Sequence, residues 1–235
     1  MENASKALIM AGSILLAMLV IGLLVFGYNE LSSLEQTKEE SKYLSKVDEY
    51  LLRFEQFNRG EDSPLYGSEL LSLANLQEDY NLSEARIDVG YEKVKITVEI
   101  KETVDEEYFQ AGKYDMEEIV KKRDELLERR QIYENTNDPK HTYKGKSVRY
   151  YSKKSYREIA NDFDIDIPSD WGNDLISEEL IINDKTKKLM QDIDDYNNII
   201  TIYNQFRTGK KFYCSNSEYD RYNGRLTSMT FTEKK

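Results

Sequence analysis

The sequence predicts an α+β protein that carries one transmembrane helix at its N-terminus. Three observations predict this class. Ala7–Phe26 is an apolar run of twenty residues without a charge. Residues 94–100 alternate between branched aliphatic and polar side chains, which is the period of a half-buried strand. Asp115 and Ser155 each precede a glutamate by three residues, a pattern that caps the start of a helix.

The apolar run is long enough to cross a lipid bilayer. A helix rises about 1.5 Å per residue, so twenty residues match a hydrocarbon core of about 30 Å. Val25-Phe26-Gly27 does not fit a small-x-small cleavage site, so we expect a retained signal anchor. Lys6 lies before the run and the next basic residue is Lys38. The positive-inside rule therefore predicts that the short N-terminus stays in the cytoplasm and that the rest of the chain is exported. Residues 1–27 are predicted to be a cytoplasmic stub and membrane helix, with the head on the outer side of the cell membrane.

Residues 28–58 are predicted to form a helical stem, because no glycine or proline interrupts them. In the second half of this segment an apolar residue recurs every three or four positions: Leu44, Val47, Leu51 and Phe54. Two heptads are too short for a typical coiled coil, so we expect this stripe to dock on the chain's own head. The turn-forming sequence of residues 58–64 ends the stem, and residues 59–235 are predicted to be one soluble α+β head.

The head is predicted to contain an antiparallel sheet of three or more strands with helices packed on one face. Asn223-Gly224 lies between two strand-like runs, which is the strongest short hairpin signal. The expected helices are 68–80, a capped helix between Asp115 and Asn135, a short one ending near Asp162, and a long one from Asp184 to Gly209. The expected strands are 93–101, 211–219 and 225–232.

Composition excludes several classes of function. The net charge of −11 argues against nucleic-acid binding, since phosphates repel an acidic surface. The chain holds one histidine, His141, and one cysteine, Cys214, with no catalytic motif around either. We expect Cys214 to be a buried, inert residue of a strand and His141 to lie in a polar loop. No phosphate-binding loop or metal-spaced cluster occurs, so the prediction is a non-enzyme without cofactor or metal. An anchored hydrolase that uses only carboxylates stays as a minor alternative.

The run Asp162–Asp166 has the D-x-D-x-D pattern that begins a calcium-binding loop. Ile167 stands where the loop requires glycine, and Asn173 stands where it requires a bidentate glutamate. The apolar residues between the aspartates instead favour a short strand with a solvated acidic edge. Calcium binding stays open, but the acidic edge is the favoured interpretation.

The segment 140–157 reverses the charge of the chain locally. It contains seven basic residues and no acidic one: Lys140, Lys144, Lys146, Arg149, Lys153, Lys154 and Arg157. Four tyrosines are interspersed among them. Such a pattern suits an anionic cell-wall polymer, or the acidic surface of a neighbouring copy, and it also occurs on ordinary solvated faces.

The opening MENASKALIMAG, followed by a polar stem and an α+β head, resembles pilin-like anchored proteins of Gram-positive bacteria and, more broadly, type IV pilins and pseudopilins. The resemblance implies a structural role in a homo- or hetero-oligomeric surface assembly. Its apolar helices would pack through small residues at Gly12, Ser13 and Gly22. In pilins the cleaved leader ends in a glycine directly before the hydrophobic helix. No glycine precedes Ala7 here, so we expect no leader cleavage. The alternative is an anchored binding module for an anionic ligand such as a cell-wall polymer, bound by the segment 140–157.

Overall fold

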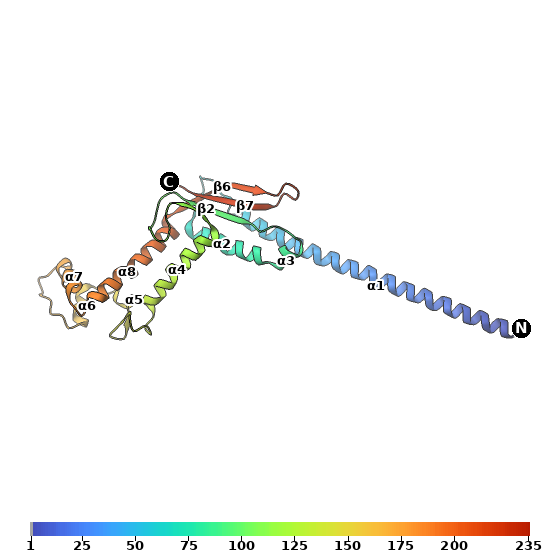
Figure 1. Cartoon of the computed structure of the whole chain (residues 1–235), viewed down its shortest axis with the longest axis horizontal. Coiled ribbons are helices and arrows are strands. Elements are labelled where there is room, and N and C mark those ends of the chain that lie inside the picture. The colour runs from blue at the N-terminus through green and yellow to red at the C-terminus, as the bar shows by residue number, and fades with distance from the viewer. Residues whose placement is uncertain (1) are drawn as a thin grey trace.

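The chain folds into an elongated α+β molecule with a long helical arm at one end (Figure 1). The computed structural model describes the backbone of residues 2–235 and the side chains of residues 10–235, so Met1 and the side chains of residues 2–9 lie outside the described residues. The helices are α1 Glu2–Glu55, α2 Gly67–Leu82, α3 Glu84–Asp88, α4 Met116–Glu134, α5 Val148–Tyr151, α6 Tyr156–Asp162, α7 Asn173–Ile182, α8 Lys187–Asn204 and the π-helical turn η1 Gln205–Gly209. The strands are β1 Leu65–Tyr66, β2 Lys95–Ile100, β3 Gly112–Asp115, β4 Thr142–Tyr143, β5 Lys146–Ser147, β6 Lys211–Tyr219 and β7 Leu226–Glu233.

Helix α1 is continuous over 54 residues, which corresponds to about 80 Å. Its N-terminal part projects away from the rest of the molecule, whereas its last turns join the head (Figure 1). Val47 and Phe54 are completely buried there, and α1 contacts both α2 and α3. The ring of Tyr80 in α2 meets the ring of Phe54 edge-on, with centroids 5.7 Å apart. One helix therefore belongs both to the arm and to the core of the head.

The five-stranded sheet has the order β1-β6-β7-β2-β3. The prediction of an antiparallel sheet is wrong in one respect, because β2 and β7 pair in parallel while the other neighbours are antiparallel. The direction of β7 is set by its hairpin with β6, which places it beside β2 after a long helical excursion. The predicted alternation in β2 is confirmed: Ile96, Val98 and Ile100 are at most 2% exposed. The helices α2 and α4 lie on one side of the sheet (Figure 1).

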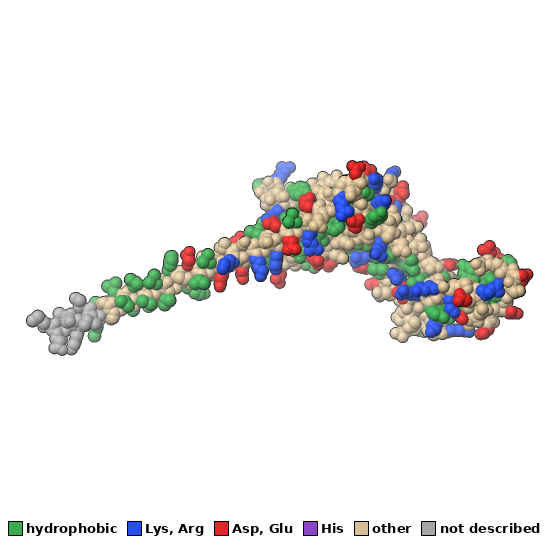
Figure 2. Space-filling view, turned by 180° about the vertical axis from the view of Figure 1, so that it is seen from behind, with side chains coloured by type: hydrophobic (Ala, Val, Ile, Leu, Met, Phe, Trp, Pro, Cys, Tyr) green, Lys and Arg blue, Asp and Glu red, His purple; other side chains and the backbone are tan. Residues whose placement is uncertain are grey.

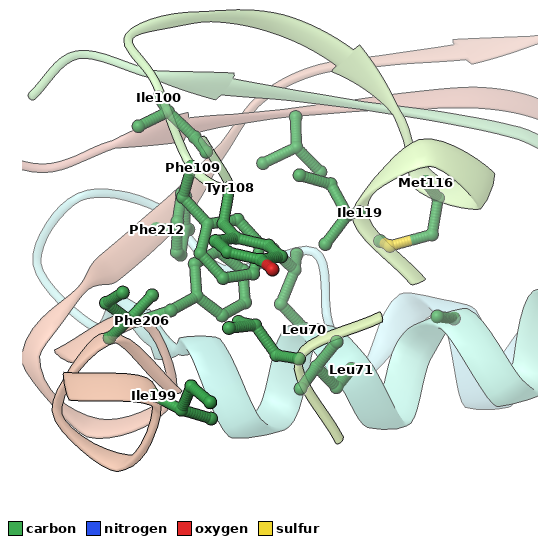
Figure 3. Packing of buried hydrophobic residues seen from close by; sticks show 14 of the residues in the cluster. Leu70, Leu71, Ile100, Tyr108, Phe109, Met116, Ile119, Ile199, Phe206 and Phe212 are labelled. Carbon is green, nitrogen blue, oxygen red and sulfur yellow. The ribbon is translucent and has the colours of Figure 1, made fainter. Parts of the chain in front are cut away.

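An aromatic cluster joins the sheet to the helices beneath it (Figure 3). Phe109 stacks on Phe206 of η1 with ring centroids 4.2 Å apart, and Phe212 of β6 lies 5.9 Å from Phe206. Gly67 begins α2 against this turn. A Cβ at Gly67 would lie 2.1 Å from the carbonyl oxygen of Phe206, so only glycine allows this approach.

A buried ion pair closes the end of the sheet beside this cluster. The Glu233 carboxylate accepts hydrogen bonds from the backbone N–H groups of Lys101 and Glu102, at 2.7 and 3.0 Å. Lys210 Nζ lies 2.5 Å from the other carboxylate oxygen, and the two side chains are only 14% and 4% exposed. These contacts tie the ends of β2, β7 and η1 together. Such a pair is stable only because its polar atoms are satisfied.

Helices α4 and α8 pack on each other and lead from the sheet to a second cluster of elements (Figure 1). We call residues 130–197 the distal lobe; it contains β4, β5, α5, α6, α7 and the adjoining ends of α4 and α8. The predicted capping boxes at Asp115 and Ser155 are both present, at the starts of α4 and α6. The chain enters the lobe through α4 and leaves through α8, so these helices form its neck.

Two predictions for the distal lobe are wrong, a short strand and the start of a helix. Residues 163–167 form no strand, because Asp164 adopts a left-handed conformation (φ 55°) that turns the chain after α6. Phe163 is nevertheless buried, and the apolar residues after it are half-buried. The long helix starts at Lys187 and not at Asp184, because residues 183–186 form turns in which Thr186 donates a side-chain hydrogen bond to the Leu180 carbonyl. Its predicted end at Gly209 is confirmed, with a final π-helical turn.

The seam between α1 and the head can be tested by truncating Phe54. Phe54→Ala removes a fully buried ring, and we expect it to lower the free energy of unfolding by about 3–5 kcal/mol. The matched control is Leu52→Ala in the same turn, because Leu52 is 68% exposed and its loss should change stability by less than about 0.5 kcal/mol. Urea unfolding of the full-length chain in detergent, followed by circular dichroism, measures both. Equal effects of the two variants would contradict the seam.

Candidate functional site

The arm carries the largest apolar surface of the described chain. Met10, Leu16 and Phe26 are each about two-thirds exposed, at 67, 68 and 68%. An 18-residue window of α1 has a mean hydropathy of 2.5, and none of this window is buried inside the molecule. Figure 2 shows apolar side chains along both edges of the visible face of this part of the helix. A helix of this length and composition near the N-terminus is consistent with a single-pass membrane anchor or a signal sequence.

The exposed apolar surface extends beyond the predicted span. Tyr28, Leu31 and Leu34 are 75, 63 and 54% exposed, with the charged Glu30 among them and further charged residues after them along the helix. A tyrosine directly after an apolar run suits the interface between hydrocarbon and water, where its ring and hydroxyl face different surroundings. About 30 Å of helix separates the end of the span from Val47, the first fully buried residue of α1.

The small residues of the span do not share one narrow face. With about 100° of rotation per residue, Gly12 and Gly22 lie about 80° apart, and Ser13 lies opposite Gly22. No atom lies within 4 Å of a Cβ built on Gly12 or Gly22, so a second helix can approach both. The Ser13 hydroxyl already donates a hydrogen bond to the Met10 carbonyl at 2.8 Å. The two glycines are therefore better placed for helix packing than Ser13.

In the distal lobe, much of the basic segment 140–157 is engaged with the chain itself. Lys154 lies 2.5 Å from the Asp162 carboxylate, which raises the pKa of the lysine above its usual value. Lys144 also binds this turn, through the carbonyl of Asp162 and the carboxylate of Asp164. Two other basic side chains likewise find partners within the lobe: Arg149 with Glu134, and Arg157 with the carbonyls of Pro168 and Trp171. The acidic run 162–166 is thus partly neutralised by the basic segment of the same copy.

Three lysines of the segment remain turned to solvent: Lys140, Lys146 and Lys153. Lys146 lies beside Tyr150, with its Nζ 5.5 Å from the ring centroid, and Lys154 lies 4.9 Å from the same ring. Tyr150 is 42% exposed. We call the exposed residues Lys146, Tyr150 and Lys153 the lysine–tyrosine surface. An aromatic ring flanked by cations presents both an apolar face and positive charge to a partner.

A buried polar network holds the β4–β5 hairpin on α8. Asp192 is 5% exposed, and its Oδ2 accepts hydrogen bonds from the Tyr143 hydroxyl at 2.6 Å and from His141 Nδ1 at 2.9 Å. Burial and the bond to Asp192 raise the pKa of Tyr143, so its hydroxyl keeps the donated proton. The His141 ring also lies edge-on to Tyr133 of α4, at a centroid distance of 4.8 Å. His141 therefore helps to hold the start of the β4–β5 hairpin against α4 and α8.

A second carboxylate, Glu134, joins α4, α5 and α8. It accepts hydrogen bonds from Arg130 and the Tyr196 hydroxyl at 2.8 and 2.9 Å, and pairs with Arg149 at 3.4 Å. Burial alone would raise the pKa of Glu134, but the hydrogen bonds from Arg130 and Tyr196 outweigh it and lower the pKa. Sequence reasoning missed this residue and Asp192. The sequence offered one signal for Asp192, because a charged residue at this position interrupts the apolar stripe of α8.

The only histidine and the only cysteine lie in different parts of the molecule, in the distal lobe and in β6. The prediction that Cys214 is fully buried is wrong, since it is only partly buried against the core, beside a register shift in β6. Its thiol lies 3.2 Å from the Ser217 hydroxyl. Among the described residues, no three His, Cys, Asp or Glu side chains are grouped to hold a metal ion.

The buried network can be tested at Asp192. Asp192→Ala leaves the Tyr143 hydroxyl and His141 without their acceptor, and we expect a loss of about 1–3 kcal/mol in the free energy of unfolding. Asp194→Ala is the matched control, because Asp194 is exposed two residues further along α8. Fluorescence of Trp171, the single tryptophan, reports unfolding of the lobe. Equal stability of the two variants would contradict the role of Asp192.

Comparison of this chain with known protein families, with curated proteins and with solved structures finds no match. Three features of the molecule itself then bear on its function. They are the exposed apolar half of α1, the buried seam that joins α1 to the head, and the distal lobe at the end of the molecule opposite the arm.

Proposed function

We propose that this chain is a single-pass membrane protein with a structural role in a surface assembly, like a pilin or pseudopilin. The single observation that carries the proposal is the continuity of α1. The exposed apolar part, the polar stem and the docked turns belong to one helix without a break. An anchor built in this way transmits its orientation directly to the head, which an unstructured linker cannot do.

The polar part of α1 sets the height of the head above the membrane. About 30 Å of exposed helix lies between the span and the docked turns. The sheet then stands off the bilayer, and the distal lobe projects beyond it (Figure 1). Surfaces at a constant height and orientation suit lateral contacts between copies. Gly12 and Gly22 give the membrane helices room for close approach, which supports association within the bilayer.

No catalytic role is proposed. His141 and Asp192 bind each other in the buried network of the distal lobe, and Cys214 lies in β6, away from both. With Lys6 as the flanking charge, the proposed topology places the short N-terminus in the cytoplasm and the head outside.

The anchor is tested by placing charges in the span. Leu16→Arg combined with Leu19→Arg should release the chain from the membrane, because each arginine near the bilayer centre costs about 2.5–3.5 kcal/mol. The control combines Leu31→Arg with Leu34→Arg, at exposed leucines of the same helix beyond the span. The measurement is the fraction of full-length chain that stays with the cell membranes after carbonate extraction.

The outer location of the head is tested on intact cells that express the full-length chain with a tag after Lys235. Added protease should remove this tag, and a protected tag would contradict the outer location.

A second function is favoured by the lysine–tyrosine surface. Tyr150 is exposed between Lys146 and Lys154, which suits an anionic polymer that offers both charge and stacking surface. In that case the chain is an anchored binding module for a cell-wall polymer, and the arm holds the lobe at the height of the polymer.

The binding module is tested with dextran sulfate as the polyanion. We expect Lys146→Glu to weaken retention of the full-length protein on this polymer, because it reverses a charge beside Tyr150. Lys113→Glu is the control, since Lys113 is exposed on β3 of the sheet. Binding is compared at low and high salt, because screening weakens contacts between exposed charges. Equal losses with both variants would indicate general charge attraction and no specific surface.

A further inference from the structure

Helix α7 of the distal lobe has an apolar face on each side. Ile176 and Leu180 are at most 1% exposed and pack into the lobe, where α7 contacts α6 and α8. On the opposite side, Leu175, Ile181 and Ile182 are 49, 45 and 70% exposed. At about 100° per residue, Leu175 and Ile182 lie within about 20° of each other on the helix surface. A helix that only covered a core would not need branched aliphatic residues on its outer side.

The outer face of α7 is also acidic. Glu178 lies exposed between Leu175 and Ile182, one turn from each, and Asp174 precedes them. Figure 2 shows acidic side chains at the outer rim of the lobe. A surface of this kind repels anionic lipid and fits a partner that is apolar and basic. We call Leu175, Glu178, Ile181 and Ile182 the α7 surface.

The lysine–tyrosine surface of the same lobe has the complementary chemistry. Tyr150 offers an exposed ring, Lys146 lies beside it, and Lys153 is exposed two residues after Tyr151. The ring can cover the aliphatic side chains of α7, and the lysine ammonium can pair with Glu178. Each surface combines exposed apolar side chains with charge of one sign, so the two are complementary both in apolar area and in charge.

We propose that the α7 surface of one copy docks on the lysine–tyrosine surface of the next copy, so that the distal lobes form a second contact in the assembly. The inference rests on the proposed assembly role, because membrane anchoring gives neighbouring copies the same height and orientation. Anchoring in one membrane raises the effective concentration of one lobe around the next, so a weak contact between lobes can form. The contact is heterologous, since two different surfaces meet, and it can continue from copy to copy.

The test exploits a charge exchange between two populations of full-length chain. Glu178→Lys places a positive charge opposite Lys146 of the next copy, and Lys146→Glu places a negative charge opposite Glu178. Each variant alone should repel itself and lower association by about tenfold or more. A mixture of the two variants restores the pairing, because the substituted α7 surface of one population meets the substituted lysine–tyrosine surface of the other with opposite charges. Association is measured as energy transfer between fluorescent proteins fused after Lys235, in dilute phosphatidylcholine vesicles at low salt.

The expected result is high energy transfer for the wild-type chain, markedly lower transfer for each variant alone, and recovery when a donor-labelled Glu178→Lys chain is mixed with an acceptor-labelled Lys146→Glu chain. Glu92→Lys is the control, because Glu92 is exposed on the sheet side of the molecule, outside the lobe. Ile182→Ser should also lower transfer, through loss of the apolar contact. Wild-type transfer in both single variants, or no recovery in the mixture, would overturn the inference. If the inference fails in either of these ways, the proposed anchor and assembly role are judged separately. Energy transfer that arises from association of the membrane helices, together with resistance to carbonate extraction, would still support that role.

Discussion

The burial of one face of α1 against the head is the contact on which the rest of the molecule depends. Val47 and Phe54 have no exposed surface, and a fully buried side chain of this size contributes about 1.5–3 kcal/mol through removal of apolar area from water. Arg225 in the β6–β7 loop reinforces the seam, 3.0 Å from Asp48 and over the ring of Tyr91. The Tyr219 hydroxyl donates to Glu55 at 2.7 Å. These contacts hold the last turns of α1 against α2, α3 and the β6–β7 hairpin.

A second junction determines where the distal lobe lies. Helix α8 returns from the lobe and ends in the π-helical turn η1, where Phe206 stacks on Phe109 and contacts Phe212. The carbonyl of Phe206 approaches Gly67 so closely that a side chain there is excluded. At the other end of the neck, Asp192 and Glu134 join α8 to α4 and to the β4–β5 hairpin through buried hydrogen bonds. Aromatic packing and a buried ion pair hold the sheet end of the neck, and buried hydrogen bonds add to apolar packing at its lobe end.

The distribution of charge in the distal lobe follows from this architecture. The acidic run 162–166 and the basic segment 140–157 are brought together in one copy, and Lys144 and Lys154 are used there. The charges that remain accessible are different ones, Lys146 and Lys153 on one surface and Glu178 on another. Because intrachain pairing engages part of each patch, the charged surfaces that stay exposed are smaller than the sequence pattern indicates. Exposed apolar side chains, Tyr150 on the one surface and those of α7 on the other, lie beside these charges.

Local patterns in the sequence were sufficient for the apolar helix, the β2 alternation, the β6–β7 hairpin and the two capping boxes, because each depends on neighbours in the chain. They were insufficient for the parallel pairing of β2 with β7, since that pairing joins strands separated by the whole neck and lobe. The residues 163–167 show the same limit, because their alternation fits a strand while the left-handed Asp164 turns the chain. Neighbouring residues thus suffice to predict an apolar helix that leads into an α+β head. Which charges stay accessible and how the arm is oriented emerge only from the folded chain, because both depend on contacts between distant segments.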